Sequence, residues 1–328
     1  MRAPGAGGHA PADGSACMIL VTGGLGFIGA HTVRALAALG QRCLAVTRRP
    51  VRGPAPFADL GGMATVVQAD PADLPSLRRA GDGHRIRGVV HLAASALGPP
   101  GERGPFVRTG VGALLNVLDA AAAWSVPRVS IASSLGVYQG VPDTPYREDA
   151  RLRQLPIDPI PAAKNAAELL AAVVTQSAGP QVINLRIATI WGPGNASRAP
   201  AVPNLVHAAV RGQPVRQPVY ADDGSDLCYV ADCARAIALL HCAGTLHHST
   251  YNVGSGRSTS PAQVRDALSR IVPGAVLELT PGRDPNGPGR DTWLDITRLR
   301  RDTGYQPAYD LDRGLRDYIG WLRNGHPH

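Results

Sequence analysis

Lys164 is the only lysine in a chain whose 33 Lys and Arg residues are otherwise all arginines. A guanidinium is planar and stays protonated, whereas an ammonium is compact and can lower the pKa of a neighbouring hydroxyl group. Lys164 follows Ile160-Pro-Ala-Ala at the start of an alanine-rich run that predicts a helix. Because residues four apart share one face of a helix, Ile160 and Lys164 are expected to point to the same place. The retained ammonium favours a chemical role for Lys164.

A glycine-rich sequence, TGGLGFIG at residues 22–29, lies between an apolar run that predicts a strand and a run that predicts a helix. Glycines let the backbone turn sharply and approach a pyrophosphate, which the N-terminus of the helix then faces. The strand–turn–helix context is the one that a dinucleotide motif requires. The residues expected to contact the cofactor here are Gly23, Gly26, Phe27, Ile28 and Gly29.

The end of the next expected strand carries Thr47-Arg48-Arg49 and no acidic residue. A carboxylate at this point would bind the 2′-hydroxyl of NAD, whereas an arginine accommodates the 2′-phosphate of NADP. The sequence therefore favours NADP through Arg48, with NAD as the alternative.

These residues need a scaffold of alternating strands and helices. Apolar runs predict strands at residues 18–22, 42–47, 64–69, 88–93, 128–133 and 181–187, and helices are expected at 30–39, 75–80, 112–124 and 161–175. Continuous apolar strands separated by helices indicate parallel strands covered on both faces. The predicted fold class is α/β, a doubly wound parallel Rossmann sheet.

Beyond Ile190 the sequence becomes rich in proline and glycine, which predicts a smaller, discontinuous C-terminal substrate lobe. Residues 229–241 and 249–253 are expected to return to the main sheet. The predicted division is a disordered leader at 1–16, a Rossmann domain at 17–190 plus about 226–254, and a substrate lobe at 191–225 plus 255–328.

Composition argues against several other classes of protein. The formal net charge is +8, but the arginines are scattered and aromatic residues are few, so no nucleic-acid partner is expected. No stretch approaches about 18 uninterrupted apolar residues, so no membrane partner is expected. Five cysteines without a C-x-x-C motif predict a reduced, cytoplasmic protein. The pair His247-His248 has no third ligand at metal spacing, so no metal is expected.

Several motifs occur in one order along the chain, and the set resembles the extended short-chain dehydrogenase/reductase family, the NAD-dependent epimerase/dehydratases. They are TGGLGFIG, Asp70, HLAA at 91–94, SSLGVY at 133–138, Lys164, WGPG at 191–194, YVADCARAI at 229–237, YNVGSG at 251–256 and the closing GYQPAYDLDRGLRDYIGWL. The resemblance implies a small-molecule substrate, usually a nucleotide-linked sugar, and a homodimer.

The resemblance also implies roles for individual residues. Asp70 and Pro71 would lie beside the adenine, and Leu92, Ala93 and Ala94 would line the cofactor. Lys164 would bond the nicotinamide ribose, and Ser134 would donate a hydrogen bond to the substrate oxygen.

Three positions depart from the family pattern. The catalytic tyrosine position is Ile160, the usual asparagine falls at Gly110, and an arginine that grips the substrate diphosphate falls at Ser225. Hydride transfer at a carbinol also moves a proton at its oxygen, and an isoleucine can neither donate nor accept one. Tyr138 and Asp158 are candidate substitutes, although a loop aromatic and a helix-start acid are the plainer interpretations.

The leading hypothesis is an atypical NAD(P)-binding enzyme that acts on a sugar, with or without a linked nucleotide, or on a hydroxylated natural-product substrate. The reaction would be ketoreduction, epimerisation or dehydration. The alternatives are a non-redox enzyme of the same fold, catalysing elimination, isomerisation or cyclisation, and an inert nucleotide-sensing protein.

Overall fold

Seven parallel strands form the central sheet of the computed structural model, which describes residues 17–51, 55–94, 103–153, 159–176, 179–197 and 200–325. The strand order is β3-β2-β1-β4-β5-β6-β9, so the order reverses between β1 and β4, where a doubly wound sheet opens its ligand crevice. The strands are β1 Cys17–Thr22, β2 Arg42–Thr47, β3 Ala64–Gln68, β4 Arg85–His91, β5 Arg128–Ser134, β6 Gln181–Ile187 and β9 Thr250–Val253.

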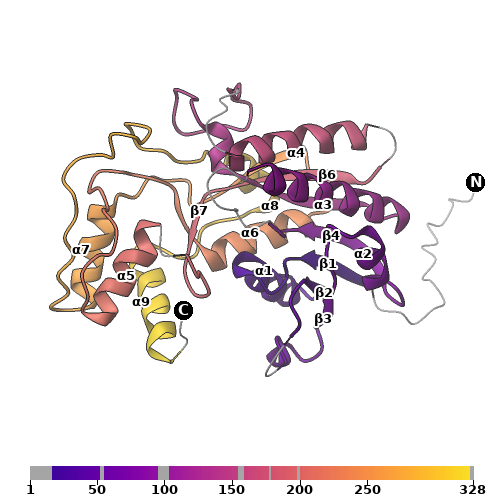
Figure 1. Cartoon of the computed structure of the whole chain (residues 1–328), viewed down its shortest axis with the longest axis horizontal. Coiled ribbons are helices and arrows are strands. Elements are labelled where there is room, and N and C mark those ends of the chain that lie inside the picture. The colour runs from indigo at the N-terminus through magenta and orange to yellow at the C-terminus, as the bar shows by residue number, and fades with distance from the viewer. Residues whose placement is uncertain are drawn as a thin grey trace, which may run out of the picture.

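Helices cover both faces of this sheet (Figure 1). Helices α1 (Phe27–Ala38) and α6 (Val230–Cys242) pack together on one face, and α2 (Leu74–Ala80), α3 (Arg103–Ala123) and α4 (Pro159–Thr175) lie on the other. Alternate residues of β1 enter the two cores, Ile19 and Val21 on the α1 side and Met18 and Leu20 on the α3 side. Two buried faces explain why the strands are apolar throughout, and the predicted fold class is confirmed.

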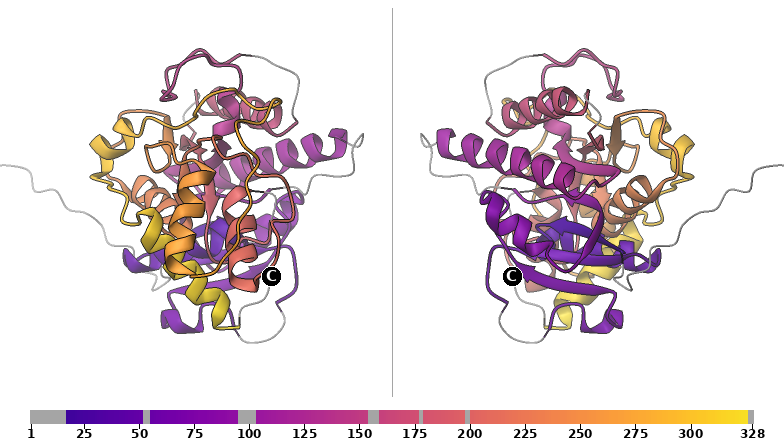
Figure 2. Two further views of the ribbon diagram at one scale, coloured as in Figure 1. Left: turned by 90° about the vertical axis from the view of Figure 1, so that its left-hand side faces the viewer. Right: turned by 90° about the vertical axis from the view of Figure 1, so that its right-hand side faces the viewer.

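A second group of helices, α5 (Ala201–Arg211), α7 (Pro261–Ile271) and α9 (Leu311–Arg323), packs around its own apolar core (Figures 1 and 2). Two short strands, β7 (Thr189–Trp191) and β8 (Leu227–Tyr229), pair in parallel beside it. Helix α8 (Thr297–Thr303) instead packs against α6 and β9. That helix therefore lies with the main sheet, whereas the predicted division placed all of 255–328 in the smaller lobe; residues 1–16 fall outside the described ranges.

Most predicted elements are present, with shifted ends. Helix α1 begins at Phe27, three residues early, because Gly26 already serves as its N-cap. Strand β4 runs from Arg85 to His91 and stops before the predicted Leu92 and Ala93. Helix α3 begins nine residues before its predicted start, since Pro105 stands in the first turn, where a missing N–H costs no helical hydrogen bond. Two short 3₁₀ helices, η1 (Ala58–Leu60) and η2 (Leu135–Tyr138), complete the main domain.

Helix α3 is apolar over most of its length. Its residues Gly104–Ala123 are long and apolar enough to cross a membrane, judged by length and composition alone. Leu114, Val117 and Leu118 of this helix are buried against the sheet, as in the core helix of a globular domain. The criterion is therefore weak evidence for a membrane span here.

Among the described residues of the main domain, His91 and His241 are buried with a hydroxyl group, and no carboxylate, bonded to the ring. His241 Nδ1 lies 2.8 Å from Ser130 Oγ, and its ring fits over β4 because Gly88 has no side chain, a Cβ there being 2.3 Å from His241 Nε2. Burial, with the nearby Arg128 and Arg87, lowers the pKa of His241 to about 3. His91 Nδ1 lies 2.7 Å from Thr22 Oγ1, and burial beside Lys164 lowers its pKa to about 3 as well. Both rings stay neutral in the folded protein at neutral pH.

This burial predicts a loss of stability in acid. Between pH of about 6.5 and 3 the unfolded chain takes up protons on His91 and His241 that the folded rings do not accept, so the free energy of unfolding should fall as the pH falls. The variant His241→Asn should remove up to about 1.4 kcal/mol per pH unit from that slope. Urea denaturation at several pH values measures this, and equal slopes for wild type and His241→Asn would contradict it.

Candidate active site

The turn after β1 brings backbone segments close together and lets a ligand come close to the backbone. Gly23 has a φ of +67°, which favours glycine, and a Cβ on Gly29 would lie 2.0 Å from the carbonyl oxygen of Gly23. Gly26 caps α1 without any side-chain acceptor, so the first-turn N–H groups of α1 are left for a ligand. Such a cradle at a helix N-terminus binds phosphate.

A cavity of about 530 Å³ opens above this turn. It collects most of the residues that the sequence predicts for the cofactor, from three loops at the carboxyl ends of β1, β2 and β4 and from Pro71 after β3. They are Gly23, Gly26, Phe27, Ile28, Gly29, Arg48, Pro71, Leu92, Ala93 and Ala94. The cradle and the cavity fit a dinucleotide stretched along the sheet edge.

Asp70 is the predicted cofactor residue that does not line this cavity. Its Oδ1 accepts a hydrogen bond of 2.9 Å from the backbone N–H of Ala72, so the carboxylate is turned to its own loop. At the end of β2, Arg48 and Arg49 are exposed, and no carboxylate is among the described residues that line the cavity. The end of the cavity beside β2 is therefore cationic.

Ser134 ends β5, and Lys164 of α4 reaches the same strand. The ammonium of Lys164 donates a 2.6 Å hydrogen bond to the carbonyl oxygen of Ala132. The strand register pairs His91 with Ile131, so Ala132 is level with Leu92, which lines the cavity. Ser134 caps η2, and its Oγ accepts a 3.1 Å hydrogen bond from Gly136 N–H, which leaves the hydroxyl proton free to be donated.

Ile160 lies in the first turn of α4, one helical turn before Lys164, beside η2. A Cβ on Gly136 would lie 3.1 Å from Cγ of Pro161 and 3.4 Å from Ser134 Oγ, so the start of α4 and the Ser134 loop are in close contact. The start of α4, which carries Ile160, thus lies against the Ser134 loop, and Lys164 one turn later is bonded to β5. Asp158 lies outside the described residues.

Tyr138 cannot replace the missing phenol. It is fully buried, its hydroxyl donates a 2.7 Å hydrogen bond to Asn252 Oδ1, and its ring stacks on Tyr146 at 4.9 Å. Burial raises the pKa of Tyr138 to about 12. The sequence-based suggestion that Tyr138 is a catalytic substitute is wrong, because the short η2 helix turns this side chain into the core.

A buried ion pair, not expected from the sequence, holds in place the part of α4 that carries Lys164. Arg186 on β6 contacts Glu168 on α4 at 2.8 Å, and both side chains are largely buried, at 7% and 10% exposed. Ser133 donates a hydrogen bond to the same carboxylate, and Arg186 donates one of 3.0 Å to the Tyr138 hydroxyl. Glu168 follows Lys164 by one turn, so the pair determines where the helix holds the ammonium. No spacing in the sequence links Arg186 to Glu168.

A second cavity, of about 680 Å³, is lined by Leu135 and Gly136, which directly follow Ser134. Gly136 and Pro161 form one wall, and Tyr146, Arg153 and Arg290 contribute the others. The Nε atom of Arg290 is buried with no hydrogen-bond partner among the described residues, while Nη2 donates to the Val141 carbonyl. Arg290 is a functional candidate that the sequence did not reveal, since one arginine among so many carries no signal. Ser225 lines neither cavity.

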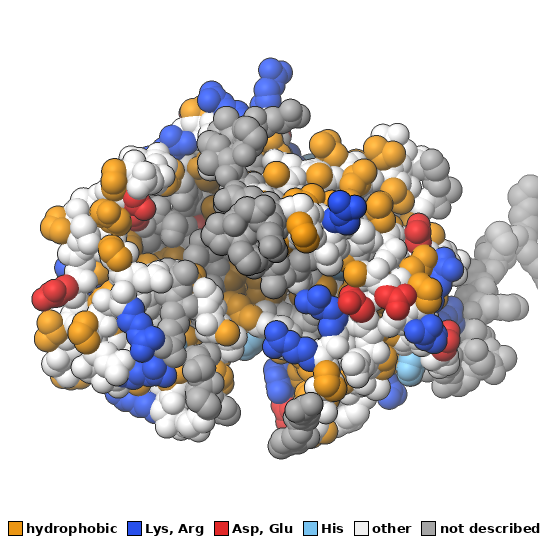
Figure 3. Space-filling model, in the orientation of Figure 1, with side chains coloured by type: hydrophobic (Ala, Val, Ile, Leu, Met, Phe, Trp, Pro, Cys, Tyr) orange, Lys and Arg blue, Asp and Glu red, His pale blue; other side chains and the backbone are white. Residues whose placement is uncertain are grey.

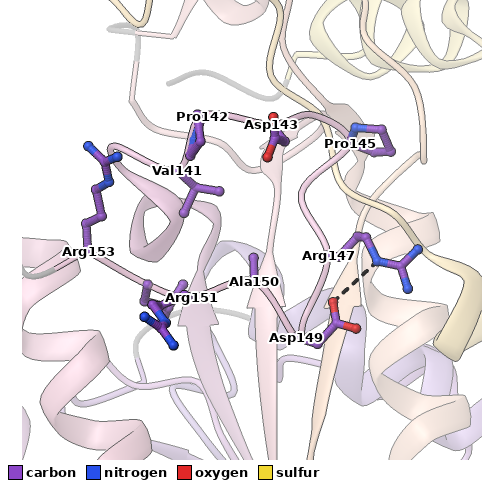
Figure 4. A pocket seen from close by; sticks show the side chains of 10 residues that line it. Val141, Pro142, Asp143, Pro145, Arg147, Asp149, Ala150, Arg151 and Arg153 are labelled. Atoms are coloured by element: carbon purple, nitrogen blue, oxygen red, sulfur yellow. Dashed lines mark hydrogen bonds and ion pairs between the residues drawn. The ribbon is translucent and has the colours of Figure 1, made fainter.

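The second cavity adjoins a third, of about 460 Å³, with which it shares Pro142 and Arg153 (Figure 4). Arg153 and Arg147 lie on opposite sides of this third cavity, and Arg147 is bonded to Asp149. Arg151 and Arg153 form no ion pair with any described residue, so the rim carries uncompensated positive charge. Within the described ranges, no group of three or more His, Cys, Asp or Glu side chains could hold a metal ion.

The arrangement joins a phosphate cradle, a hydroxyl and an ammonium at the sheet edge, and a cationic cavity beyond them. The cradle and the cationic cavity can each bind an anionic ligand, and the hydroxyl and the ammonium between them can exchange a proton with one of these ligands.

Comparison with known proteins agrees with this geometry. The chain is 28% identical to a UDP-glucose 4-epimerase of Azospirillum brasilense, over 93% of this chain and 92% of that protein. It is also 28% identical to a dTDP-glucose 4,6-dehydratase of Streptomyces niveus, over 93% of each chain. The structure of MoeE5 in complex with UDP-glucuronic acid and NAD superposes with a TM-score of 0.79 and 29% identity, covering 94% of this chain and 99% of that one.

A family model matches residues 19–254, which include the whole cofactor cradle, Ser134 and Lys164. This chain therefore belongs to the NAD dependent epimerase/dehydratase family.

Proposed function

We propose that this protein is an enzyme that binds a nicotinamide dinucleotide and acts on a nucleotide-linked sugar by epimerisation, dehydration or ketoreduction. One observation carries the proposal: Ser134 directly precedes the residues that line the arginine-containing cavity, and Lys164 is bonded to Ala132, which is level with Leu92 in the cofactor cavity. The curated relatives that support it are a UDP-glucose epimerase and a dTDP-glucose dehydratase. When bound, the cofactor would supply a hydride acceptor and donor.

The protein's own groups would then position the sugar and handle its proton. The glycine turn holds the cofactor diphosphate, and Lys164 donates to a hydroxyl of its ribose. Ser134 donates its free hydroxyl proton to the reacting oxygen of the sugar. Ile160 and Pro161 cover this oxygen with apolar surface and exclude water, which strengthens each of these hydrogen bonds.

The nucleotide diphosphate of the substrate is assigned to the cavity around Arg290. An unpartnered, buried guanidinium N–H is costly unless a ligand accepts from it, and arginine binds phosphate oxygens in pairs. Arg153 adds a second cation to the same cavity, whose described lining contains no carboxylate. This arginine set compensates for the arginine missing at Ser225.

A non-redox reaction on the same substrate is the second candidate, and Ile160 is the observation that favours it. Without a phenol at this position, an elimination or isomerisation that needs no strong acid at the sugar oxygen would be less affected than hydride transfer.

We also propose that the protein is a homodimer formed through α3 and α4. These two helices pack side by side, and their outer face carries exposed apolar side chains (Figure 3). Leu169 is 65% exposed and Val173 is 66% exposed, with Leu115 and Val174 beside them. An apolar face of this kind is typical of a surface covered by a second copy.

For the cofactor we propose NADP(H), recognised by Arg48, with NAD(H) as the alternative. The variant Arg48→Ala should weaken NADPH binding by about 1.5–3 kcal/mol, the worth of a charge-assisted hydrogen bond, and leave NADH binding almost unchanged. Arg42→Ala, at the other end of β2, is the matched control. Titration calorimetry measures the affinity of each variant for NADPH and NADH. Tighter binding of NADH than of NADPH by the wild type would contradict the proposal.

The assignment of Arg290 predicts a loss of nucleotide binding. Arg290→Ala should weaken the binding of UDP or dTDP by about 1.5–3 kcal/mol, because a guanidinium bonded to phosphate is removed. Arg301→Ala, on the surface of α8, should have no effect. Calorimetry with each nucleotide tests this, and unchanged affinity in Arg290→Ala would show that the diphosphate binds elsewhere.

The position of Ile160 predicts the result of restoring the phenol. In Ile160→Tyr the new hydroxyl would lie one turn from Lys164, whose charge lowers a phenol pKa. If the native reaction is redox, single-turnover hydride transfer followed at 340 nm should rise severalfold. If it is non-redox, the native reaction should be obstructed with at most trace hydride transfer. A variant indistinguishable from wild type in activity and ligand binding would place Ile160 outside the active site.

A further inference from the structure

The absence of a phenol beside Ser134 leaves a proton without a carrier. A serine hydroxyl can donate and accept hydrogen bonds, but it does not carry a charge at neutral pH. Tyr138 is buried in the core, and the described lining of the substrate cavity contains no carboxylate or histidine. Arg153 and Arg290 stay protonated in any protein environment. Tyr146 also lines this cavity, but its ring stacks on the buried Tyr138. Among the described residues held against β5 beside Ser134, the ionisable group that can both give and take a proton is therefore Lys164.

The hydrogen bonds of Lys164 leave room for this role. An ammonium has three N–H donors, and one of them is bonded to the Ala132 carbonyl oxygen. The other two have no partner among the described residues. A ribose hydroxyl can take one of them, and the third remains for a substrate oxygen. Ala132 precedes Ser134 by two residues on β5, which is about 6.6 Å along a strand, so the ammonium and the serine hydroxyl can reach one oxygen between them.

We propose that Lys164 itself exchanges the proton of the reacting substrate hydroxyl, taking over the part of the missing phenol. This inference rests on the proposed function. On oxidation the O–H bond breaks and its proton binds the neutral Lys164 Nζ, which becomes an ammonium, while the carbon-bound hydrogen leaves as hydride to the oxidised nicotinamide. The sugar carbon becomes a carbonyl carbon. On reduction both steps reverse, and Lys164 returns the proton to the oxygen.

The surroundings of Lys164 suit a group that must release its proton. Burial lowers the pKa of Lys164, and Glu168 one turn further along α4 opposes this. Arg186 on β6 already compensates that carboxylate through the buried ion pair. His91 on β4 is neutral because its pKa is lowered to about 3, so it adds no positive charge to compete with the ammonium. Ile160, where a phenol would share the proton, is an apolar neighbour.

The single lysine makes the proposal directly measurable. Protein grown on lysine labelled with ¹³C at Cε carries its lysine label at one residue, so one NMR resonance reports the protonation of Lys164 without chemical modification. We expect this resonance to titrate at lower pH than the same label in an unfolded peptide containing residues 159–169. If the Lys164 resonance titrates at the same pH as the peptide resonance, the proposal is overturned, because such a lysine stays protonated at neutral pH. In Ile160→Ser, which admits water, the titration should move toward that of the peptide.

A second measurement separates proton exchange from simple binding of the ribose. Lys164→Arg keeps a positive charge and several N–H donors but cannot release a proton. With NAD(P)⁺ and either UDP-glucose or dTDP-glucose as the probe, it should lose hydride transfer at 340 nm by about a hundredfold or more while cofactor affinity changes less than about tenfold. Hydride transfer at the wild-type rate in Lys164→Arg would overturn the proposal. If neither probe reacts with the wild type, the NMR titration decides.

A failure of the proposed function itself would look different. In that case the wild-type protein would bind neither a nicotinamide dinucleotide nor a nucleoside diphosphate, whatever the titration of Lys164.

Discussion

The ion pair between Arg186 and Glu168 is the interaction on which the rest of the site depends. It joins β6 to α4 across the end of β5, and both charges are removed from water. Removing one partner of such a pair typically costs about 3–5 kcal/mol, because the other charge is left buried alone. The pair therefore holds α4 in one position relative to the sheet. Lys164, one turn before Glu168, is placed against β5 as a consequence.

The same pair explains why polar groups gather inside an otherwise apolar domain. Arg186 also donates to the Tyr138 hydroxyl and to the Glu148 carbonyl oxygen, and Tyr138 is bonded to Asn252 on β9. Each buried polar group in this network has a partner, as burial requires. The network makes the carboxyl edge of β5, β6 and β9 rigid. A rigid edge is what a site needs if it must hold a serine hydroxyl and an ammonium near one oxygen.

The departures from the family pattern have a common chemical theme. Ile160 stands where the family pattern has a tyrosine, and Ser225 stands where it has an arginine. In our proposals Lys164 takes the role of the tyrosine, and Arg290, on a different segment, supplies the charge of the arginine. The cofactor cradle carries no such change. Binding of the dinucleotide is thus separated in the structure from the groups that decide what happens to the substrate.

Local sequence determined the scaffold and the cofactor half of the site. Apolar runs of strand length, the glycines at 23, 26 and 29, and the helical spacing of Ile160 and Lys164 all act between residues that are neighbours in the chain. Their geometry follows from covalent order, so strands 42–47 and 181–187 were predicted with their exact bounds. Helix ends were less certain, because caps and tolerated prolines shift them by a turn or more, as at α3.

Tertiary structure alone decided the substrate half. Whether Tyr138 points into the core or the cavity depends on η2 and on Asn252, 114 residues further along the chain. Arg290 shares a cavity with Gly136 and donates to the carbonyl oxygen of Val141, 149 residues earlier in the chain. Glu168 contacts Arg186 because β5 and β6 pair in a fixed register and α4 packs over these strands. Contacts between distant segments depend on how whole layers pack, and a chain in which nearly every cation is an arginine gives no local sign of which arginine will be buried.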